Sequence, residues 1–177
     1  SGSAARLFTF DSLLNPSSVM NADYNNYLLA DQALFCKKLK VQGGSDFYMN
    51  VNEWQVFTSQ DARSLAHDPL FADEAGGDFH LQSITGRYAP GIGWTNDAEH
   101  SPLIDAGAPS FAYDQEQEPN GSRINIGLYG NCADASLSRT NPWLLAVSFN
   151  DGGVLSGTNE LYWLHGNTAT TDTVRVE

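Results

Sequence analysis

The chain has 177 residues, of which 41% are hydrophobic and 17% charged, a balance typical of a globular domain and not of a disordered segment. Asp and Glu outnumber Lys and Arg by 21 to 9, so the formal net charge at pH 7 is −12. A surface this acidic repels phosphate backbones, so we expect no nucleic-acid partner. The sequence has no apolar run of about 18 residues, so we expect no membrane insertion.

Cys36 and Cys132 are the two cysteines, too few and too far apart for a zinc or redox motif. Two interpretations stay open for them. They form a disulfide in an oxidising compartment, or they are two buried free thiols, since a free cysteine behaves as a small hydrophobe. The opening Ser1-Gly2-Ser3 is typical of a cloning remnant, so we expect the chain to be covalently part of a larger multidomain protein.

Two elements are predicted in the first third of the chain. Residues 34–41 combine apolar side chains on one face with lysines, which predicts a strand. Asn50 and Glu53 have the spacing of a capping box, which predicts a helix of about two turns. Trp54 and Phe57 share one face of that helix, and a polar cluster follows it.

Two further strands are predicted beyond the helix. Residues 78–81 follow a Gly-Gly turn, and residues 123–129 alternate strictly between apolar and other side chains. In the first of these, His80 alternates with two apolar neighbours, so we expect it to point outward. Pro-Gly, Asn-Gly and Asp-Gly turns are spread along the chain, a pattern that allows a sandwich, a barrel or a solenoid.

Several blocks of sequence decide between these folds by resemblance. They include Asp-Pro-Leu-Phe-Ala-Asp, Ser-Pro-Leu-Ile-Asp-Ala-Gly and Arg-Ile-Asn-Ile-Gly-Leu-Tyr-Gly, within residues 68–73, 77–82, 101–107, 118–130 and 133–136. In this order they resemble the closing coils of bacterial secreted right-handed parallel β-helix repeat proteins, which have the pectate-lyase-like fold. The resemblance covers about residues 20–136. It implies an all-β chain that forms the last coils and C-terminal cap of a β-helix with one short helix, and it says little about activity.

In such a solenoid each coil buries its apolar face on the next. The residues expected to fill the interior are Phe71, Phe79, Leu81, Leu103, Ile104, Ile124, Ile126 and Leu128. We therefore assign residues 1–138 to the end of the β-helix. Residues 139–177 are similar to the first strands of an immunoglobulin-like module, and they are too few for a complete sandwich of ~100 residues. They are expected to be the start of that module or a β-hairpin extension.

Basic residues are candidates for catalysis, because β-helix polysaccharide lyases generally use Lys or Arg to remove a proton next to a uronate carboxylate, often with calcium. If the chain is a lyase, Lys37, Lys38 and Arg63 are the expected catalytic residues. The competing interpretation is a solvated strand whose lysines discourage edge-to-edge aggregation.

Carboxylates gather in the loop before Pro119. Asp114, Glu116 and Glu118 are the candidate calcium ligands, since hard cations prefer several flexible oxygens. Paired carboxylates also suit glycoside hydrolysis, for which Asp105 is a fourth candidate, although a turn-capping role explains that residue equally well. The competing interpretation is a solvated polar loop, with no cofactor bound.

Aromatic residues in the irregular stretch before Pro119 give the best indication of function. Tyr88, Trp94 and Tyr113 are the predicted carbohydrate-binding residues, because flat rings beside carboxylates and amides suit the apolar face and hydroxyls of a sugar. The competing interpretation is that Tyr88 and Trp94 pack a long loop onto the solenoid.

Three functions are therefore considered. The first is a non-catalytic module that binds polysaccharide or cell-surface glycan, or displays the protein on the surface, outside the cell. The second is a fragment of a polysaccharide lyase or glycoside hydrolase, and the third is a structural spacer. A binding module predicts a line of exposed aromatic rings, whereas an enzyme predicts a groove in which Lys37 or Arg63 faces a carboxylate.

Overall fold

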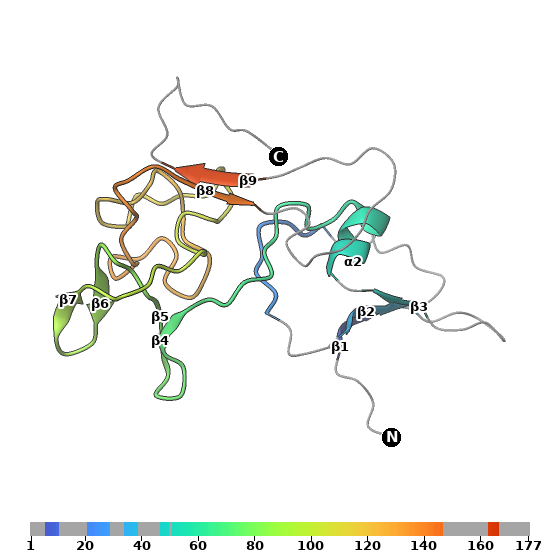
Figure 1. Cartoon of the computed structure of the whole chain (residues 1–177), viewed down its shortest axis with the longest axis horizontal. Coiled ribbons are helices and arrows are strands. Elements are labelled where there is room, and N and C mark those ends of the chain that lie inside the picture. The colour runs from blue at the N-terminus through green and yellow to red at the C-terminus, as the bar shows by residue number, and fades with distance from the viewer. Residues whose placement is uncertain are drawn as a thin grey trace. The chain divides into compact units, whose positions relative to one another are not determined.

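The computed structural model describes residues 6–10, 21–28, 34–38, 47–49, 51–146 and 163–166. The chain falls into two compact units, residues 1–67 with 147–162 and residues 68–146 with 163–177. Within the described ranges the structure is all-β, with small sheets and a single short helix (Figure 1). That helix is too short to cross a bilayer.

The first unit contains a three-stranded sheet in the order β1-β2-β3, built from Arg6–Phe10, Leu34–Lys38 and Phe47–Met49. β1 and β2 are parallel, with Arg6 opposite Leu34, whereas β3 is antiparallel to β2. The strand predicted over residues 34–41 is thus confirmed as far as Lys38, and its last three positions lie outside the described residues.

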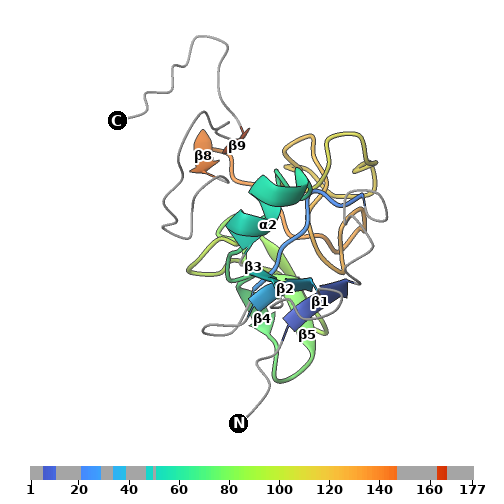
Figure 2. The same ribbon diagram turned by 90° about the vertical axis from the view of Figure 1, so that its right-hand side faces the viewer.

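The predicted helix is present as α2, Val51–Thr58, and it lies beside β3 in both views (Figures 1 and 2). Its Trp54 side chain is fully buried, at 0% exposure. The Thr58 hydroxyl donates to the Trp54 carbonyl oxygen at 2.7 Å, and Ser59 then leaves the helix with a left-handed φ of 55°. The expected cap, Asn50, lies outside the described residues.

A second parallel contact in the first unit joins residues 25–27 to Leu65. The Leu65 N–H donates to the Asn25 carbonyl at 2.7 Å, and the Tyr27 N–H donates to the Leu65 carbonyl at 2.9 Å. The Asn26 side chain extends this pairing, because its amide both donates to and accepts from the backbone of His67, at 2.9 and 3.0 Å. The Asn26 amide thus forms the two hydrogen bonds that the backbone of one further paired residue would form.

The second unit contains three two-stranded antiparallel sheets. They pair β4 (Phe71–Asp73) with β5 (Asp78–Leu81), β6 (Arg87–Ala89) with β7 (Gly93–Thr95), and β8 (Trp143–Ala146) with β9 (Trp163–Gly166). β5 is the strand predicted after the Gly-Gly turn, where Gly77 adopts a φ of 83°. β8 and β9 pair antiparallel in the region after residue 138, with Trp143 opposite Gly166.

The core of the second unit is built from a few aliphatic side chains and several serines. Leu81, Leu103 and Ile104 are at most 6% exposed, as predicted. The Ser136 hydroxyl donates to the Leu81 carbonyl at 2.5 Å, and the Ser83 hydroxyl donates to the Leu137 carbonyl at 2.7 Å. Hydroxyls thus satisfy buried carbonyls that a regular sheet would pair with N–H groups.

The strand predicted over residues 123–129 is wrong, because this stretch forms turns. Its buried residue is Asn125, at 5% exposure, while Leu128 is 70% exposed. The Asn125 amide accepts from the Asp105 N–H and donates to the Ser136 carbonyl, both at 2.8 Å. Two backbone hydrogen bonds accompany them, from the Gly107 N–H to the Ile124 carbonyl and from the Ile126 N–H to the Leu103 carbonyl, both at 2.9 Å. The side-chain hydrogen bonds thus bury the polar Asn125, where the alternation predicted a buried apolar face.

The expected orientation of His80 is also wrong. His80 is 2% exposed, and Phe79, expected in the interior, is 37% exposed with its ring edge-on to Phe71 at 5.3 Å. The pairing of β4 with β5 changes register between Phe71 and Asp73. Such an irregularity interrupts the alternation of faces, which allows His80 and Leu81 to be buried in succession.

Candidate functional site

The candidate site is the hairpin of β6 and β7, residues 87–95, called here the aromatic hairpin. Its turn is set by sequence: Pro90 precedes Gly91, which has a φ of 77°, and the Ile92 N–H donates to the Ala89 carbonyl at 3.0 Å. Proline and then glycine are the residues that a type II turn requires at its two central positions. Ile92 lies at the tip and is 84% exposed.

Two of the predicted sugar-binding residues face each other on this hairpin. Tyr88 lies opposite Trp94 in the strand register, and their rings meet edge to face, with centroids 5.9 Å apart and planes at 73°. Trp94 is 40% exposed, whereas Tyr88 is partly buried. The sequence therefore identified a pair that the fold brings together, with the larger ring accessible to a ligand.

A buried aromatic stack supports this pair. Tyr88 lies 6.1 Å from the ring of His80, and His80 stacks on Tyr129 at 3.6 Å with 13° between the planes. Four rings thus run from the core to the exposed face of Trp94. Sequence patterns missed His80 and Tyr129, because each lies in a stretch whose strict alternation placed it on the wrong face.

An ion cluster fixes the base of the hairpin. Arg87 binds Asp97 through Nε and Nη2, at 3.0 and 3.1 Å, and its Nη1 reaches Asp78 at 3.4 Å. Asp78 also contacts Nδ1 of His80 at 2.5 Å. Burial alone would raise the pKa of Asp78, but hydrogen bonds from His80 and the charge of Arg87 outweigh it and lower that pKa. The hairpin is therefore anchored by a two-pronged arginine contact, the strongest kind of side-chain ion pair.

The third predicted aromatic residue lies apart from this pair. Tyr113 is partly exposed, and within the described residues its ring makes no contact with Tyr88 or Trp94. Its carbonyl accepts the Glu116 N–H at 3.0 Å in a turn. Nearby, Phe111 is 64% exposed.

The three predicted calcium ligands, Asp114, Glu116 and Glu118, do not form one group of carboxylates. Glu116 is 5% exposed and its Oε1 accepts the N–H groups of Asn125 and Asn131, at 3.0 and 2.8 Å, whereas Asp114 and Glu118 are exposed. The Oε2 atom of Glu116 is buried and has no hydrogen-bond partner in the described part of the chain. Burial raises the pKa of Glu116, although the two backbone donors oppose this. Across the described ranges, no three His, Cys, Asp or Glu residues form a group able to hold a metal ion.

Asp105 is a second buried carboxylate in this unit. It is 3% exposed, has a left-handed φ of 59°, and accepts a hydrogen bond from the Ser138 hydroxyl at 2.6 Å. Burial raises its pKa to about 6, and the charge of Glu116 adds to the effect. The backbone conformation agrees with the turn role that the sequence suggested.

The three basic candidates lie in the first unit. Lys37 and Lys38 pair with Tyr48 and Phe47 across β2 and β3, and their side chains lie outside the described part. Arg63 donates to Asp23 at 2.8 Å and lies over the Tyr24 ring, 5.3 Å from its centroid. These contacts give Arg63 a structural role on the surface.

Cys132 is a free, exposed thiol. This differs from both interpretations of the cysteines, since Cys132 is neither in a disulfide nor buried. Its sulfur lies 3.8 Å from the Gly130 carbonyl, in the turns that follow residue 129.

A family model described as "Disaggregatase related" matches residues 43–107, a range that includes α2 and the aromatic hairpin. No curated protein and no solved structure matches the chain.

Proposed function

We propose that this chain is a non-catalytic carbohydrate-binding module of a larger extracellular or cell-surface protein, and that the aromatic hairpin is its binding surface. The observation that carries the proposal is the exposed Trp94 ring, set edge to face against Tyr88. An indole face offers a flat apolar surface to the C–H face of a sugar ring. The exposed Asn96 lies two residues along the chain; its amide nitrogen donates to the Ile84 carbonyl at 3.0 Å, and its amide oxygen is an acceptor for sugar hydroxyls.

The rigidity of the hairpin supports this role. Arg87 and Asp97 fix its base, and the His80 ring, tilted by 53° to the ring of Tyr88 at 6.1 Å, supports the ring pair on its inner side. A surface ordered before the ligand arrives loses little conformational entropy on binding. This small entropy loss matters most for ligands that bind weakly, such as single sugar rings.

The fold we propose is the end of a right-handed parallel β-helix over residues 1–138, followed by the start of an immunoglobulin-like module. Support comes from the parallel pairing of β1 with β2 and from the parallel bridge between Asn26 and Leu65. Parallel neighbours need a long crossover between them, which a solenoid coil supplies. Small antiparallel sheets in the second unit fit a cap that closes the open end of such a solenoid.

The family description adds context and a second candidate function. A disaggregatase, by its name, disperses aggregates, so a related module suits binding to the polymer that holds an aggregate together. The same description favours, as the alternative, a fragment of a depolymerising enzyme, a polysaccharide lyase or glycoside hydrolase. The engagement of Arg63 with Asp23 and Tyr24 supports the binding role over this alternative.

The test is binding of the whole chain to a panel of immobilised polysaccharides, followed by titration calorimetry on the best ligand. Trp94→Ala should weaken binding by about tenfold or more, as removal of a central aromatic contact does. Trp163→Ala is the matched control, because Trp163 is 41% exposed on β9, close to the 40% of Trp94 on β7. Equal affinity of the wild type and Trp94→Ala would reject the hairpin as the binding surface.

The two alternatives have their own readouts in the same experiment. Release of reducing ends or of unsaturated uronate from the bound polysaccharide would identify an enzyme and overturn the non-catalytic role. A folded chain that binds none of the polysaccharides would be a structural spacer.

A further inference from the structure

The charges around the aromatic hairpin are strongly unbalanced. Residues 64–122 contain ten acidic residues but only one Lys or Arg, which is Arg87 at the base of the hairpin. Glu74 is exposed in the turn between β4 and β5, and Glu99 is exposed shortly after the end of β7. β5 also contacts β6 of the hairpin. A charged ligand that approaches the exposed Trp94 ring therefore meets a negative potential.

Arg87 does not offer a positive charge to a ligand, because it already binds two carboxylates. Its Nε and Nη2 bind Asp97 at 3.0 and 3.1 Å, and its Nη1 reaches Asp78 at 3.4 Å. All three nitrogens of the guanidinium are thus engaged, and the side chain is only 13% exposed. A carboxylate on a ligand would have to displace one of these ion pairs, which lie at the anchor of the hairpin.

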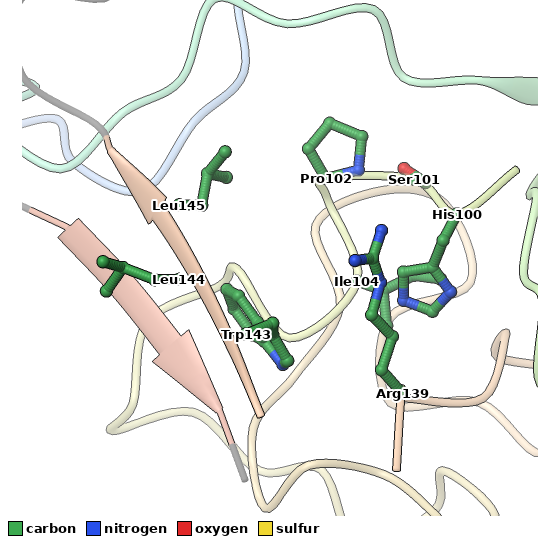
Figure 3. Close-up of a pocket in the computed structure, with 8 residues that line it drawn as sticks. All are labelled: His100, Ser101, Pro102, Ile104, Arg139, Trp143, Leu144 and Leu145. Carbon is green, nitrogen blue, oxygen red and sulfur yellow. The ribbon is translucent and has the colours of Figure 1, made fainter. Parts of the chain in front are cut away.

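The other arginines described in the second unit are Arg123 and Arg139. Nε of Arg123 donates to the Gly107 carbonyl at 2.6 Å. Arg139 lines a cavity of about 90 Å³ between residues 100–104 and 139–145, and no residue of the aromatic hairpin lines that cavity (Figure 3). The described residues of this unit include no lysine. The hairpin therefore has no cation to pair with the carboxylate or sulfate group of an acidic sugar.

The exposed ring of Trp94 favours the opposite charge. The face of an indole carries partial negative charge and attracts a cation more strongly than the rings of Tyr or Phe do. Trp94 is 40% exposed, so an ammonium group can reach it. An amino sugar has an apolar C–H face and a protonated amine on the same ring, and both groups interact favourably with an indole.

From this distribution of charge we infer that the aromatic hairpin selects glycans that carry free amino groups, such as polymers of hexosamine, over neutral and acidic glycans. The amine lies against the Trp94 ring, and the surrounding carboxylates raise the local concentration of the cationic ligand. The inference rests on the proposed function and deepens it, because it names the class of ligand for the same surface.

The first experiment compares three small ligands that differ in one group, methyl glucosaminide, methyl glucoside and methyl glucuronide. Each is titrated into the ¹⁵N-labelled whole chain at about pH 6, where the amine is protonated. The Trp94 indole signal, assigned with Trp94→Phe, is followed. The glucosaminide should bind about three- to tenfold more tightly than the glucoside, and the glucuronide should bind most weakly. The difference should shrink as salt is raised.

Equal affinity for the glucosaminide and the glucoside would overturn the inference and retain the hairpin as a surface for neutral sugars. Tighter binding of the glucuronide would overturn it as well. If none of the three sugars shifts the indole signal and no polysaccharide binds through Trp94, the proposed function itself is rejected, and the inference with it.

The second experiment changes the charge at the tip of the hairpin. Ile92 is 84% exposed, so its replacement leaves the interior unchanged, and it lies about 7 Å along the strand from Trp94. That distance is within the Debye length of about 10 Å at 0.1 M salt. Relative to the neutral control Ile92→Gln, Ile92→Lys should weaken glucosaminide binding about threefold and Ile92→Glu should strengthen it. Binding of the glucoside should be the same in all three variants.

A longer glucosamine oligosaccharide separates the hairpin from the charge of the whole chain, which is −12. Its preference over the matching glucose oligosaccharide should be lost in Trp94→Ala and kept in the exposed-tryptophan control Trp163→Ala. A preference that persists in Trp94→Ala, or that does not respond to the charge at position 92, would assign it to general attraction and overturn the inference.

Discussion

Trp54 donates its indole N–H to Oδ2 of Asp61 at 3.0 Å, and both residues are 0% exposed. The other carboxylate oxygen accepts from Asn25, Tyr27 and Ser64, at 3.1, 3.2 and 2.6 Å. A buried charge is tolerated when its oxygens are fully hydrogen-bonded, and Asp61 meets that condition. Through it, α2, the 25–27 segment and the 61–65 segment are held at one point.

Trp54→Phe should therefore destabilise the first unit by about 1–3 kcal/mol, because it removes one donor to a buried carboxylate while keeping most of the apolar volume. Urea unfolding followed by circular dichroism measures this. A loss below about 0.5 kcal/mol would show that the N–H contact is dispensable.

Asp61→Asn tests the same contact from the other side. The three donors to Oδ1 keep the amide oxygen on their side, so the amide nitrogen turns toward the Trp54 N–H and two donors face each other. We expect Trp54→Phe to cost less in this background than in the wild type. A double-mutant cycle that gives additive losses would contradict the pairing.

Local signals account for the parts of the fold that the sequence predicted correctly. α2 lies where a short-range pattern within one segment predicted a helix, and β5 follows directly after the adjacent Gly-Gly turn. The strand predicted over residues 123–129 had an equally regular local pattern. It failed because Asn125 finds its partners far along the chain, at Asp105 and Ser136, and no local pattern contains those contacts.

In the candidate site, too, the sequence predicted short-range contacts correctly and missed long-range ones. Tyr88 and Trp94 were found because they flank one Pro-Gly turn, so their pairing is a short-range property. Glu116 was assigned to a metal site, yet its Oε1 is occupied by two backbone N–H groups from later turns. The cavity lined by residues 100–104 and 139–145 had no sequence signal, because these two segments meet only in the folded chain.

The buried carboxyl of Asp105 should make stability depend on pH. Its pKa is raised from 3.8 to about 6 in the folded state, so the protonated form is favoured by folding. This contribution is complete below about pH 4 and is lost as the pH rises through 6. Asp105→Asn does not titrate, so its stability relative to the wild type should increase by about 2–3 kcal/mol between pH 4 and pH 7.

Urea unfolding of both proteins at several pH values gives this difference. The Asn side chain keeps an acceptor for the Ser138 hydroxyl, so the comparison isolates the charge. Glu116, whose pKa is also raised, is present in both proteins. A difference that stays constant over this pH range would show that Asp105 is ionised throughout.

His100 should act in the opposite direction over the same pH range. Its pKa falls from 6.5 to about 4 on folding, so its contribution to stability is present above pH 6.5 and is lost as the pH falls toward 4. His100→Gln should therefore gain about 1–2 kcal/mol relative to the wild type between pH 7 and pH 4, after allowance for partial exposure. Asp105 and His100 thus contribute to the wild-type stability with opposite dependence on pH. The two variants should diverge from it with opposite slopes, and parallel slopes would contradict the assignments.

A comparison of alanine at Gly121 with alanine at Gly91 distinguishes backbone strain from side-chain crowding. It has a φ of 57°, and a β-carbon there would overlap the Asp105 carboxylate, whereas Gly91 has a φ of 77° and open space around the same position. Alanine at either site bears a left-handed penalty of about 1–2 kcal/mol. Gly121→Ala should cost more than Gly91→Ala, because Asp105 must also move and its hydrogen bond to Ser138 is disturbed. Thermal unfolding of both variants measures the excess. That excess should disappear when Asp105→Ala is combined with Gly121→Ala, and equal losses in the two single variants would mean that the carboxylate moves aside freely.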